Sequence, residues 1–377
     1  MRSKKAVISI IIPIYKGQRF INKIIGMLEN VRSNAKHYEL EIMLVNDYPK
    51  EDIFIDTYLK GPIHLIKNKE NLGIHKSRIE GLLYSTGEYI LFLDQDDTID
   101  TEYFVSQLNH IRNKQCVICN GIWRKVEKIF PNSNLMKTRY DFDEYLKNGY
   151  PLVSLGQLMI KKESIPKVWI EKTMICNGWD DHYLWAAMMV NGVTVATNND
   201  VLYIHEEDGD NFSFNWKQMA KSGEEFKEIF IANQLLDIEQ KKKFFELVNA
   251  KINKYKEYDT LQFLMNKCTA KNIENLLLSK GINLIAIYGI GIFGKKLLEI
   301  LNDTQINVLY GIDRNNVEKK EEFPIYSISK KNIFVDAIIV TPVEQFEKIK
   351  KEIEPIYNCK IISLMELLIE VDDGKCC

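Results

Sequence analysis

The stretch that decides the fold is YILFLDQDDT, residues 89–98, in which a short apolar run meets three carboxylates. Residues 89–93 have the composition of a buried strand, and Asp94, Asp96 and Asp97 follow within four positions. Like charges repel, and burying them is costly unless a cation lies between them. The stretch is therefore either a solvated turn after a strand or a site for a divalent cation with a phosphate beyond it.

The residues that precede this stretch alternate between strand-like and helix-like patterns. Runs rich in Ile and Val predict buried strands, and apolar residues at helical spacing predict helices. We expect strands over residues 6–15, 39–47, 63–68 and 88–94, and helices over 19–34 and 75–86. This alternation predicts a parallel, doubly wound α/β sheet, whose ligands bind beyond the carboxyl ends of the strands. The acidic cluster lies at such an end.

The composition narrows the class of protein. The 377 residues allow two domains, and 46% hydrophobic residues provide a large core. A net charge of −2 argues against nucleic acid as a partner. Seven scattered Cys do not form a disulfide pattern, and the single C-x-x-C of Cys116 and Cys119 lacks the second pair of a zinc site. Without an evident secretory signal or membrane span, we expect a cytoplasmic protein, and peripheral contact with the inner membrane face stays open.

Two phosphate chemistries fit the acidic cluster. A strand followed by D-x-D-x-T looks like the nucleophile motif of haloacid dehalogenase-type phosphatases, with Asp94 attacking phosphorus and Asp96 as acid and base. Alternatively, the cluster binds a cation that bridges a nucleoside diphosphate and neutralises it as a leaving group. A phosphatase of that type begins near its nucleophile strand, whereas here some ninety residues of α/β sequence precede it. That context favours the second interpretation.

Four segments carry a fuller resemblance. They are SIIIPIYKGQRFI (9–21), LEIMLVNDYPKED (40–52), IKNKENLGIHKSRIEGLLYSTGEYILFLDQDD (66–97) and NGWDDHYLWAAMMVNG (177–192). In this order they resemble the family 2 glycosyltransferases, which are inverting enzymes of the GT-A fold, over about residues 6–215. The third segment is the most specific because its N-x-G, S-R, G-E-Y-I and L-D-x-D-D elements all have the family's spacing.

The resemblance implies roles in binding the donor. Asp47 matches the Asp that accepts the uracil N3–H, although Tyr48 and Pro49 replace the usual Gly and Ser. Arg78 matches an Arg near the nucleotide, and its planar guanidinium suits a phosphate. A turn-capping role for Asp47 and a solvated helix position for Arg78 remain the structural alternatives.

Further residues would line the nucleotide sugar. Pro13 and Tyr15 match the end of the family's first strand, where the backbone lines the base, and Lys16 stands where the family often has Asn. The resemblance also places Gln95 against the nucleotide sugar, together with Asp94 and Asp96.

The D-x-D-type cluster implies a metal. Asp96 and Asp97 are expected nearest to the ion, with Asp94 facing ribose or metal, and hard oxygen ligands suit Mn²⁺ or Mg²⁺. His205 is the candidate for an additional ligand, because some GT-A enzymes use a late His, although a lone His is more often structural.

Inversion requires a base for the acceptor hydroxyl. The pair Asp180 and Asp181 matches the family's acidic pair before an amphipathic helix, and Asp181 aligns with the usual base. Capping of the helix would equally explain one Asp there. Trp179 and Trp185 could stack on sugars, but core packing is the commoner use of Trp.

A glycine-rich turn marks a second α/β region. Gly289, Gly291 and Gly294 lie between an expected strand and helix, and Asp313 ends the next strand. This is a dinucleotide-binding fingerprint in its usual context, and it resembles small Rossmann-like modules appended to sugar-modifying enzymes. An NAD-type dinucleotide is one option. The others are a nucleotide sensor, a structural module and a dimerisation or docking element.

We therefore expect three regions: a GT-A domain (1–215), a helical connector (216–280) and a smaller Rossmann-like domain (281–377). The expected function is metal-dependent, inverting transfer from a nucleotide sugar, with UDP-sugars favoured, to a hydroxyl of a glycan on a lipid or protein. Bacterial surface polysaccharide synthesis would fit, and a homo-oligomer stays open. The alternatives are the phosphatase, a non-catalytic nucleotide-binding module and an NAD-linked enzyme.

Overall fold

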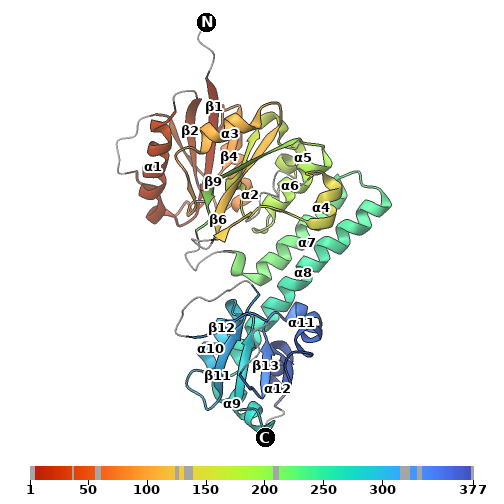
Figure 1. Cartoon of the computed structure of the whole chain (residues 1–377). Coiled ribbons are helices and arrows are strands. Elements are labelled where there is room, and N and C mark those ends of the chain that lie inside the picture. The colour runs from red at the N-terminus through yellow and green to blue at the C-terminus, as the bar shows by residue number, and fades with distance from the viewer. Residues whose placement is uncertain are drawn as a thin grey trace. The chain divides into compact units, whose positions relative to one another are not determined.

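A computed structural model describes residues 5–35, 38–55, 61–123, 127–130, 139–206, 212–314, 323–328 and 333–374 of the chain. The chain divides into two compact units, Met1–Ile252 and Asn253–Cys377, and we describe each unit by itself. Figure 1 shows their helices and strands.

The first unit is built on a mixed sheet, which has nine strands among the described residues in the order β3-β2-β1-β4-β8-β6-β9-β5, with β7 beside β6. The pairs β1–β2, β2–β3 and β1–β4 are parallel, whereas β8 runs antiparallel to both β4 and β6. The strands are β1 (Ala6–Ile14), β2 (Tyr38–Asn46), β3 (Ile63–Lys67), β4 (Tyr89–Phe92), β5 (Thr98–Ile99), β6 (Cys116–Trp123), β7 (Glu127–Lys128), β8 (Leu158–Lys161) and β9 (Val195–Ile204).

Helices cover both faces of the parallel part, which explains why β1 is buried along most of its length. Ile10 and Ile12 of β1 share a core with helix α1, whereas Ile11 points the other way and meets Gly81 of α2. The helices of this unit are α1 (Gln18–Ser33), α2 (Ile74–Tyr84), α3 (Tyr103–Ile111), α4 (Phe142–Asn148), α5 (Lys167–Glu171), α6 (Asp180–Val190), α7 (Trp216–Asn233) and the first part of α8 (Ile238–Lys267).

The first four expected strands and the two expected helices are present, with ends that differ by one or two residues. The parallel pairing of β1 to β4 is therefore confirmed, but the sheet as a whole is mixed rather than parallel, because β8 runs antiparallel to β4 and β6. The carboxyl ends of β1, β2 and β4 meet at one edge, as the register Ile14↔Asn46 and Ile11↔Phe92 requires. The mixed half of the sheet, built from β5 to β9, follows the alternating segments and extends from Thr98 to Ile204.

The second unit holds an all-parallel sheet in the order β12-β11-β10-β13-β14, with the glycine-rich turn directly after its central strand. Its elements are α9 (Ala270–Ser279), β10 (Leu284–Tyr288), α10 (Ile292–Leu301), β11 (Asn307–Ile312), β12 (Ile325–Tyr326), β13 (Ala337–Val340), α11 (Phe346–Ile353), β14 (Lys360–Ser363) and α12 (Leu364–Asp372). This order is that of a doubly wound sheet, and it confirms a second α/β region.

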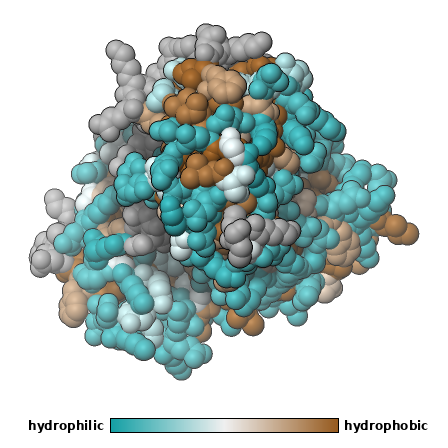
Figure 2. Space-filling model, turned by 90° about the horizontal axis from the view of Figure 1, so that it is seen from below, coloured by the Kyte–Doolittle hydropathy of each residue, from teal (hydrophilic) through white to brown (hydrophobic). Residues whose placement is uncertain are grey.

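Hydrophilic residues cover most of the face shown in Figure 2, and hydrophobic residues appear there in scattered groups. Within the described ranges, no helix is both long enough and apolar enough to cross a membrane.

Candidate functional site

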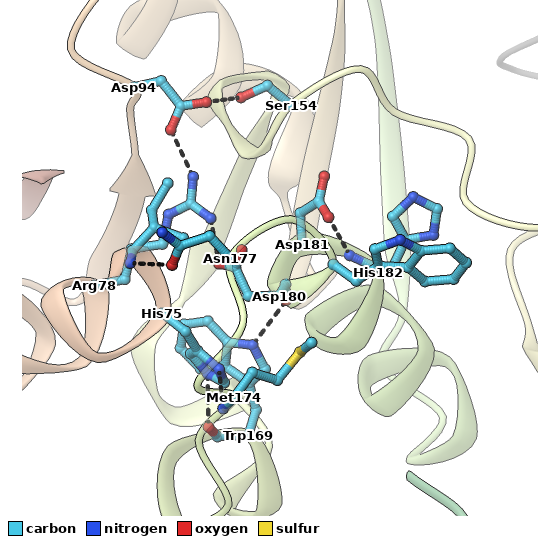
Figure 3. A network of polar contacts seen from close by, with 12 residues as sticks. His75, Arg78, Asp94, Ser154, Trp169, Met174, Asn177, Asp180, Asp181 and His182 are labelled. Atoms are coloured by element: carbon cyan, nitrogen blue, oxygen red, sulfur yellow. Dashed lines mark hydrogen bonds and ion pairs between the residues drawn. The ribbon is translucent and has the colours of Figure 1, made fainter. Parts of the chain in front are cut away.

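The site is organised around the guanidinium of Arg78, on the second turn of α2. One of its NH2 groups donates to Asp94 Oδ1 at 2.6 Å and the other to Asp180 Oδ2 (Figure 3). The Arg78 side chain is only 3% exposed, and that of Asp180 is 4% exposed. A buried ion pair of this kind holds geometry well, because loss of either partner leaves an uncompensated charge. Arg78 thus joins the end of β4 to the start of α6.

Asp47 organises the turn from which α2 begins. Its carboxylate accepts from the backbone N–H groups of Leu72 and Gly73, at 2.7 and 2.9 Å, and from the Asn68 side chain at 2.8 Å. Gly73 has a φ of 84°, which favours glycine. The buried Asp47 therefore fixes the direction in which α2 and Arg78 leave the sheet. Its role towards a base remains a prediction.

Asp94 lies just beyond β4 and is held on both oxygens. Besides Arg78, the hydroxyl of Ser154 donates to Asp94 Oδ2 at 2.9 Å (Figure 3). The side chain is 26% exposed, so it remains accessible to a ligand. Gln95 ties this strand end to that of β1, since it accepts from Tyr15 N at 3.0 Å and donates to Tyr15 O at 3.3 Å. The Tyr15 ring is 43% exposed and packs edge-on against Tyr48.

Asp96 and Asp97 have different surroundings. Asp97 is buried, and its carboxylate accepts from Tyr203 Oη, from the Glu206 backbone N–H at 3.1 Å and from His205 Nδ1 at 3.1 Å. Burial alone would lower the pKa of His205, but the contact with Asp97 raises it above its ordinary value. The structure thus brings the predicted late His to the acidic cluster.

Ionisation of Asp96 is disfavoured by its surroundings. Burial, followed by the charges of Asp94 and Asp97, raises the pKa of Asp96 to about 7. The described residues contain no group of three or more His, Cys, Asp or Glu side chains placed to hold a metal ion. A magnesium ion in proteins commonly takes one or two carboxylates and completes its shell with substrate phosphates and water. A role of Asp96 in binding a cation together with a diphosphate remains a prediction.

The acidic pair at the start of α6 divides into two roles. Asp180 is committed to Arg78, whereas Asp181 accepts from the neighbouring His182 N–H at 2.6 Å and remains partly exposed (Figure 3). Burial, and then the charge of Asp180, raises the pKa of Asp181 to about 7. A carboxylate with a pKa near neutrality suits proton abstraction.

Helix α7 holds the loop that leads to this pair. The Glu225 carboxylate accepts from the backbone N–H groups of Ile175 and Cys176, both at 2.7 Å. Ser222 accepts from Trp179 N and donates to Cys176 O, both at 3.0 Å. The sequence interpretation missed both residues, because they lie in an ordinary amphipathic helix without a motif.

Helix α2 also makes hydrogen bonds to the loop that precedes Asp180. Ile74 N donates to the side chain of Asn177 at 3.0 Å, and Met174 N donates to His75 Nδ1 at 3.0 Å. Burial lowers the pKa of His75 to about 4, so the ring is neutral and its other nitrogen donates to Trp169 O. Figure 3 shows these contacts below Arg78. The loop before Asp180 and the start of α6 are thus held by hydrogen bonds from two helices, α2 and α7.

The two candidate sugar-stacking tryptophans are buried. Trp179 is 1% exposed and Trp185 2% exposed. Trp185 packs edge-on against Tyr140 and Tyr150. Both therefore serve mainly as core residues next to the acidic pair.

In the second unit, the glycine turn has the geometry that the fingerprint predicts. Gly289 has a φ of 88°, a Cβ on Gly291 would meet no atom within 4 Å, and a Cβ on Gly294 would lie 2.2 Å from Gly289 O. These are the tight turn, the open approach and the close helix packing of a dinucleotide fold. Asp313, however, also accepts from the Ile290 N–H in the turn, at 3.3 Å. Dinucleotide binding here remains a prediction.

The comparisons with known proteins concern the family and the fold of the first unit. The family model described as "Glycosyl transferase family 2" matches residues 9–169. This segment belongs to the family 2 glycosyl transferases. The match, together with the mixed sheet, confirms a GT-A-like fold for the first unit and sets aside the phosphatase interpretation. The family 2 segment contains Asp47, Arg78 and the acidic cluster, whereas Asp180, Asp181 and His205 lie beyond it.

Two curated relatives extend the likeness. An uncharacterized glycosyltransferase of Haemophilus influenzae is 31% identical over 91 residues, which cover 24% of this chain and 30% of that protein. A poly(ribitol-phosphate) beta-glucosyltransferase of Bacillus spizizenii is 24% identical over 245 residues, which cover 63% of this chain and 38% of that protein. The chain thus spans well under half the length of these relatives.

Solved structures are similar at lower identity. TarS 1-349 of S. aureus in complex with UDP-GlcNAc has a TM-score of 0.49 and 14% identity, covering 66% of this chain and 72% of that one. The mannosyltransferase PcManGT of Pyrobaculum calidifontis, in complex with GDP-Man and Mn²⁺, has a TM-score of 0.45 and 16% identity, covering 66% and 70%.

Proposed function

We propose that the first unit transfers a sugar from a nucleotide-sugar donor, a UDP-sugar, to a hydroxyl group of an acceptor polymer, with inversion at the anomeric carbon. The observation that carries this proposal is the junction made by Arg78, which brings the acidic end of β4 to the acidic pair of α6 inside a family 2 fold. The residues proposed for the donor diphosphate and the acidic pair proposed for acceptor deprotonation are thus connected through one guanidinium.

The donor lies along the carboxyl ends of β1, β2 and β4. Tyr15 and Tyr48 offer exposed aromatic surface for a base, and Asp94 lies between Arg78 and Ser154 at the sugar end. Asp96 would hold Mn²⁺ or Mg²⁺ together with the diphosphate, with Asp97 and His205 behind it. When bound, the cation supplies positive charge that stabilises the leaving diphosphate.

Asp181 is the base. Its partly exposed carboxylate accepts the proton of the acceptor hydroxyl as that oxygen attacks the anomeric carbon. Asp180 stays in its pair with Arg78 and positions the start of α6. The N-cap residue of α6 is Trp179, and Asp180 is bonded to Arg78, so this division of roles explains the pair better than helix capping by Asp180.

The acceptor is a phosphate-containing surface polymer. Support comes from the Bacillus spizizenii relative, whose name specifies a poly(ribitol-phosphate) acceptor, and whose similarity extends over 63% of this chain. The share of that protein matched is only 38%, so the linkage and the polymer unit require direct measurement.

A donor screen tests the function. We expect release of UDP from one UDP-sugar in the presence of Mn²⁺ or Mg²⁺, loss of that release with a chelator, and a markedly higher metal requirement in Asp96→Asn. Glu171→Gln, an exposed carboxylate on α5, is the matched control. Turnover that is indifferent to both the chelator and Asp96→Asn would refute the metal assignment, and UDP binding without turnover would favour a non-catalytic module.

A further inference from the structure

A small cavity lies beside the acidic pair, between α4, α6 and α8. Its volume is about 110 Å³. Since a cavity of about 150 Å³ holds a benzene molecule, there is room for a group the size of a phosphate. The lining residues are Tyr145, Asn148, Gly149, Tyr150, Trp179, His182, Leu247, Val248 and Lys251. This set contains one cation, Lys251, and no Asp or Glu, although the charge of Asp181 reaches the Tyr150 hydroxyl on the cavity wall.

The cation is Lys251, and the side chain that it is bonded to is an uncharged histidine. Lys251 Nζ donates to His182 Nε2 at 2.9 Å and lies over the Trp179 ring, 5.2 Å from the centroid. Burial, and then the charge of Lys251, lowers the pKa of His182 well below its ordinary value, so the ring is neutral. The ammonium of Lys251 therefore lies at the cavity wall beside an uncharged imidazole.

Tyr150 adds an unused donor. Its Oη is buried and has no hydrogen-bond partner among the described residues. Burial, and then the charge of Asp181, raises the pKa of Tyr150, so the hydroxyl keeps its proton. A buried hydroxyl without a partner costs free energy, which a ligand acceptor oxygen would recover.

The cavity is adjacent to the proposed base. His182 follows Asp181 and donates its backbone N–H to it, and the charge of Lys251 acts on the pKa of Asp181. The cavity and the proposed base are thus linked through adjacent residues of α6, His182 and Asp181. The rings of Tyr145, Tyr150 and Trp179 provide surface for the carbon atoms between them.

We propose that this cavity binds a phosphodiester group of the acceptor, next to the hydroxyl that receives the sugar. This inference rests on the proposed function, because it names what the acceptor side of the same site recognises. Lys251 supplies the charge, Tyr150 the neutral hydrogen bond, and the aromatic walls contact the polyol or sugar carbons.

Calorimetric titration of the full chain tests the inference without requiring turnover. The probes are a short polyol oligomer joined by phosphodiesters and the same polyol without phosphate. We expect the phosphodiester probe to bind wild type more tightly than the neutral one, and Lys251→Met to weaken it about tenfold, which is about 1.4 kcal/mol. Lys241→Met, an exposed lysine of the same helix, is the control and should bind as wild type does.

Equal binding of the two probes to wild type, or unchanged binding to Lys251→Met, would overturn the inference. If Lys251→Met does not fold, as judged by its thermal unfolding, Tyr150→Phe decides instead. It keeps the ring, and it should weaken the phosphodiester probe severalfold, whereas unchanged binding counts against the site. A parallel assay of UDP release from the donor by wild type measures the proposed function separately.

Discussion

Strands β4 and β10 are both buried and both pair in parallel with a neighbouring strand. The polar groups beyond their carboxyl ends, however, come from different parts of the chain. At the end of β4, Asp94 is bonded to Arg78 of α2 and to Ser154, and Arg78 reaches Asp180 of α6. At the end of β10, the Thr341 hydroxyl donates to Gly289 O at 2.6 Å, and Ile290 N donates to Asp313 at 3.3 Å.

The two strand ends therefore differ in the chemistry that they can support. The first gathers charged side chains from segments about a hundred residues apart, and burial moves two of their pKa values to about 7. The second has a glycine turn with the geometry of its motif, and its described polar contacts mostly stabilise the turn itself. A catalytic site needs several functional side chains close together in space. A glycine turn by itself offers only backbone N–H and C=O groups.

The largest expected effect is that of Asp181→Asn, which tests the convergence directly. Removal of the base should lower kcat of sugar transfer by about 10²–10⁴, with a nearly unchanged donor KM. The raised pKa means that charge on Asp181 destabilises the folded state above pH 7, so the variant should also have a higher Tm at pH 8. UDP-release kinetics and thermal unfolding measure both, and full activity in Asp181→Asn would remove the base assignment.

Glu225→Ala tests whether α7 belongs to the site. Two hydrogen bonds from the carboxylate to the loop before Asp180 are lost, and charged hydrogen bonds contribute about 1.5–3 kcal/mol each. We expect kcat to fall about ten- to a hundredfold while the donor KM stays the same. Glu228→Ala, an exposed residue of the same helix, is the matched control. Equal kcat in both variants would show that the loop needs no support from α7.

The pH profile should report the environment of Asp181. Only the ionised carboxylate can accept a proton, so kcat should fall about tenfold per pH unit below about 7 and level off above it. Since Lys251 favours the ionised form, Lys251→Met should move this limb to higher pH. A limb near pH 4 would mean that the carboxylate titrates as if it were solvated.

The smallest effect on sugar transfer is expected in the glycine turn. Gly294→Ala places a Cβ against Gly289 O and should destabilise the second unit by about 1–3 kcal/mol. Gly291→Ala meets open space and should leave unfolding nearly unchanged. Both variants should transfer sugar at wild-type rates when folded, as measured by UDP release. A loss of sugar transfer in Gly291→Ala would show that the glycine turn also contributes to catalysis, so that the two strand ends would not differ as described.

Several features of the site follow from local sequence patterns. Alternating apolar runs placed β1, β2 and β4 within one or two residues, and the segment around Arg78 has the family's spacing. The roles of individual residues were harder to predict. Arg78 was expected near the nucleotide, but its guanidinium is already bonded to two carboxylates.

Other contributors carry no local signal. Ser154 donates one hydrogen bond to Asp94, and Glu225 accepts two from the loop at Ile175 and Cys176. These partners are distant along the chain, and neither Ser154 nor Glu225 sits in a recognisable motif. Lys251 lies in a helix with many other lysines, and its contacts with His182 and Trp179 in space distinguish it.

The sequence by itself determined the parallel strands, the acidic end of β4 and the glycine turn after β10, because periodicity and turn chemistry are local properties of the chain. Only the tertiary structure decided that Asp180 pairs with Arg78 while Asp181 stays available, and that α7 and α8 support the acidic pair. The physical reason is that ionisation and hydrogen bonding depend on burial and on neighbours in space, which residues distant along the chain supply.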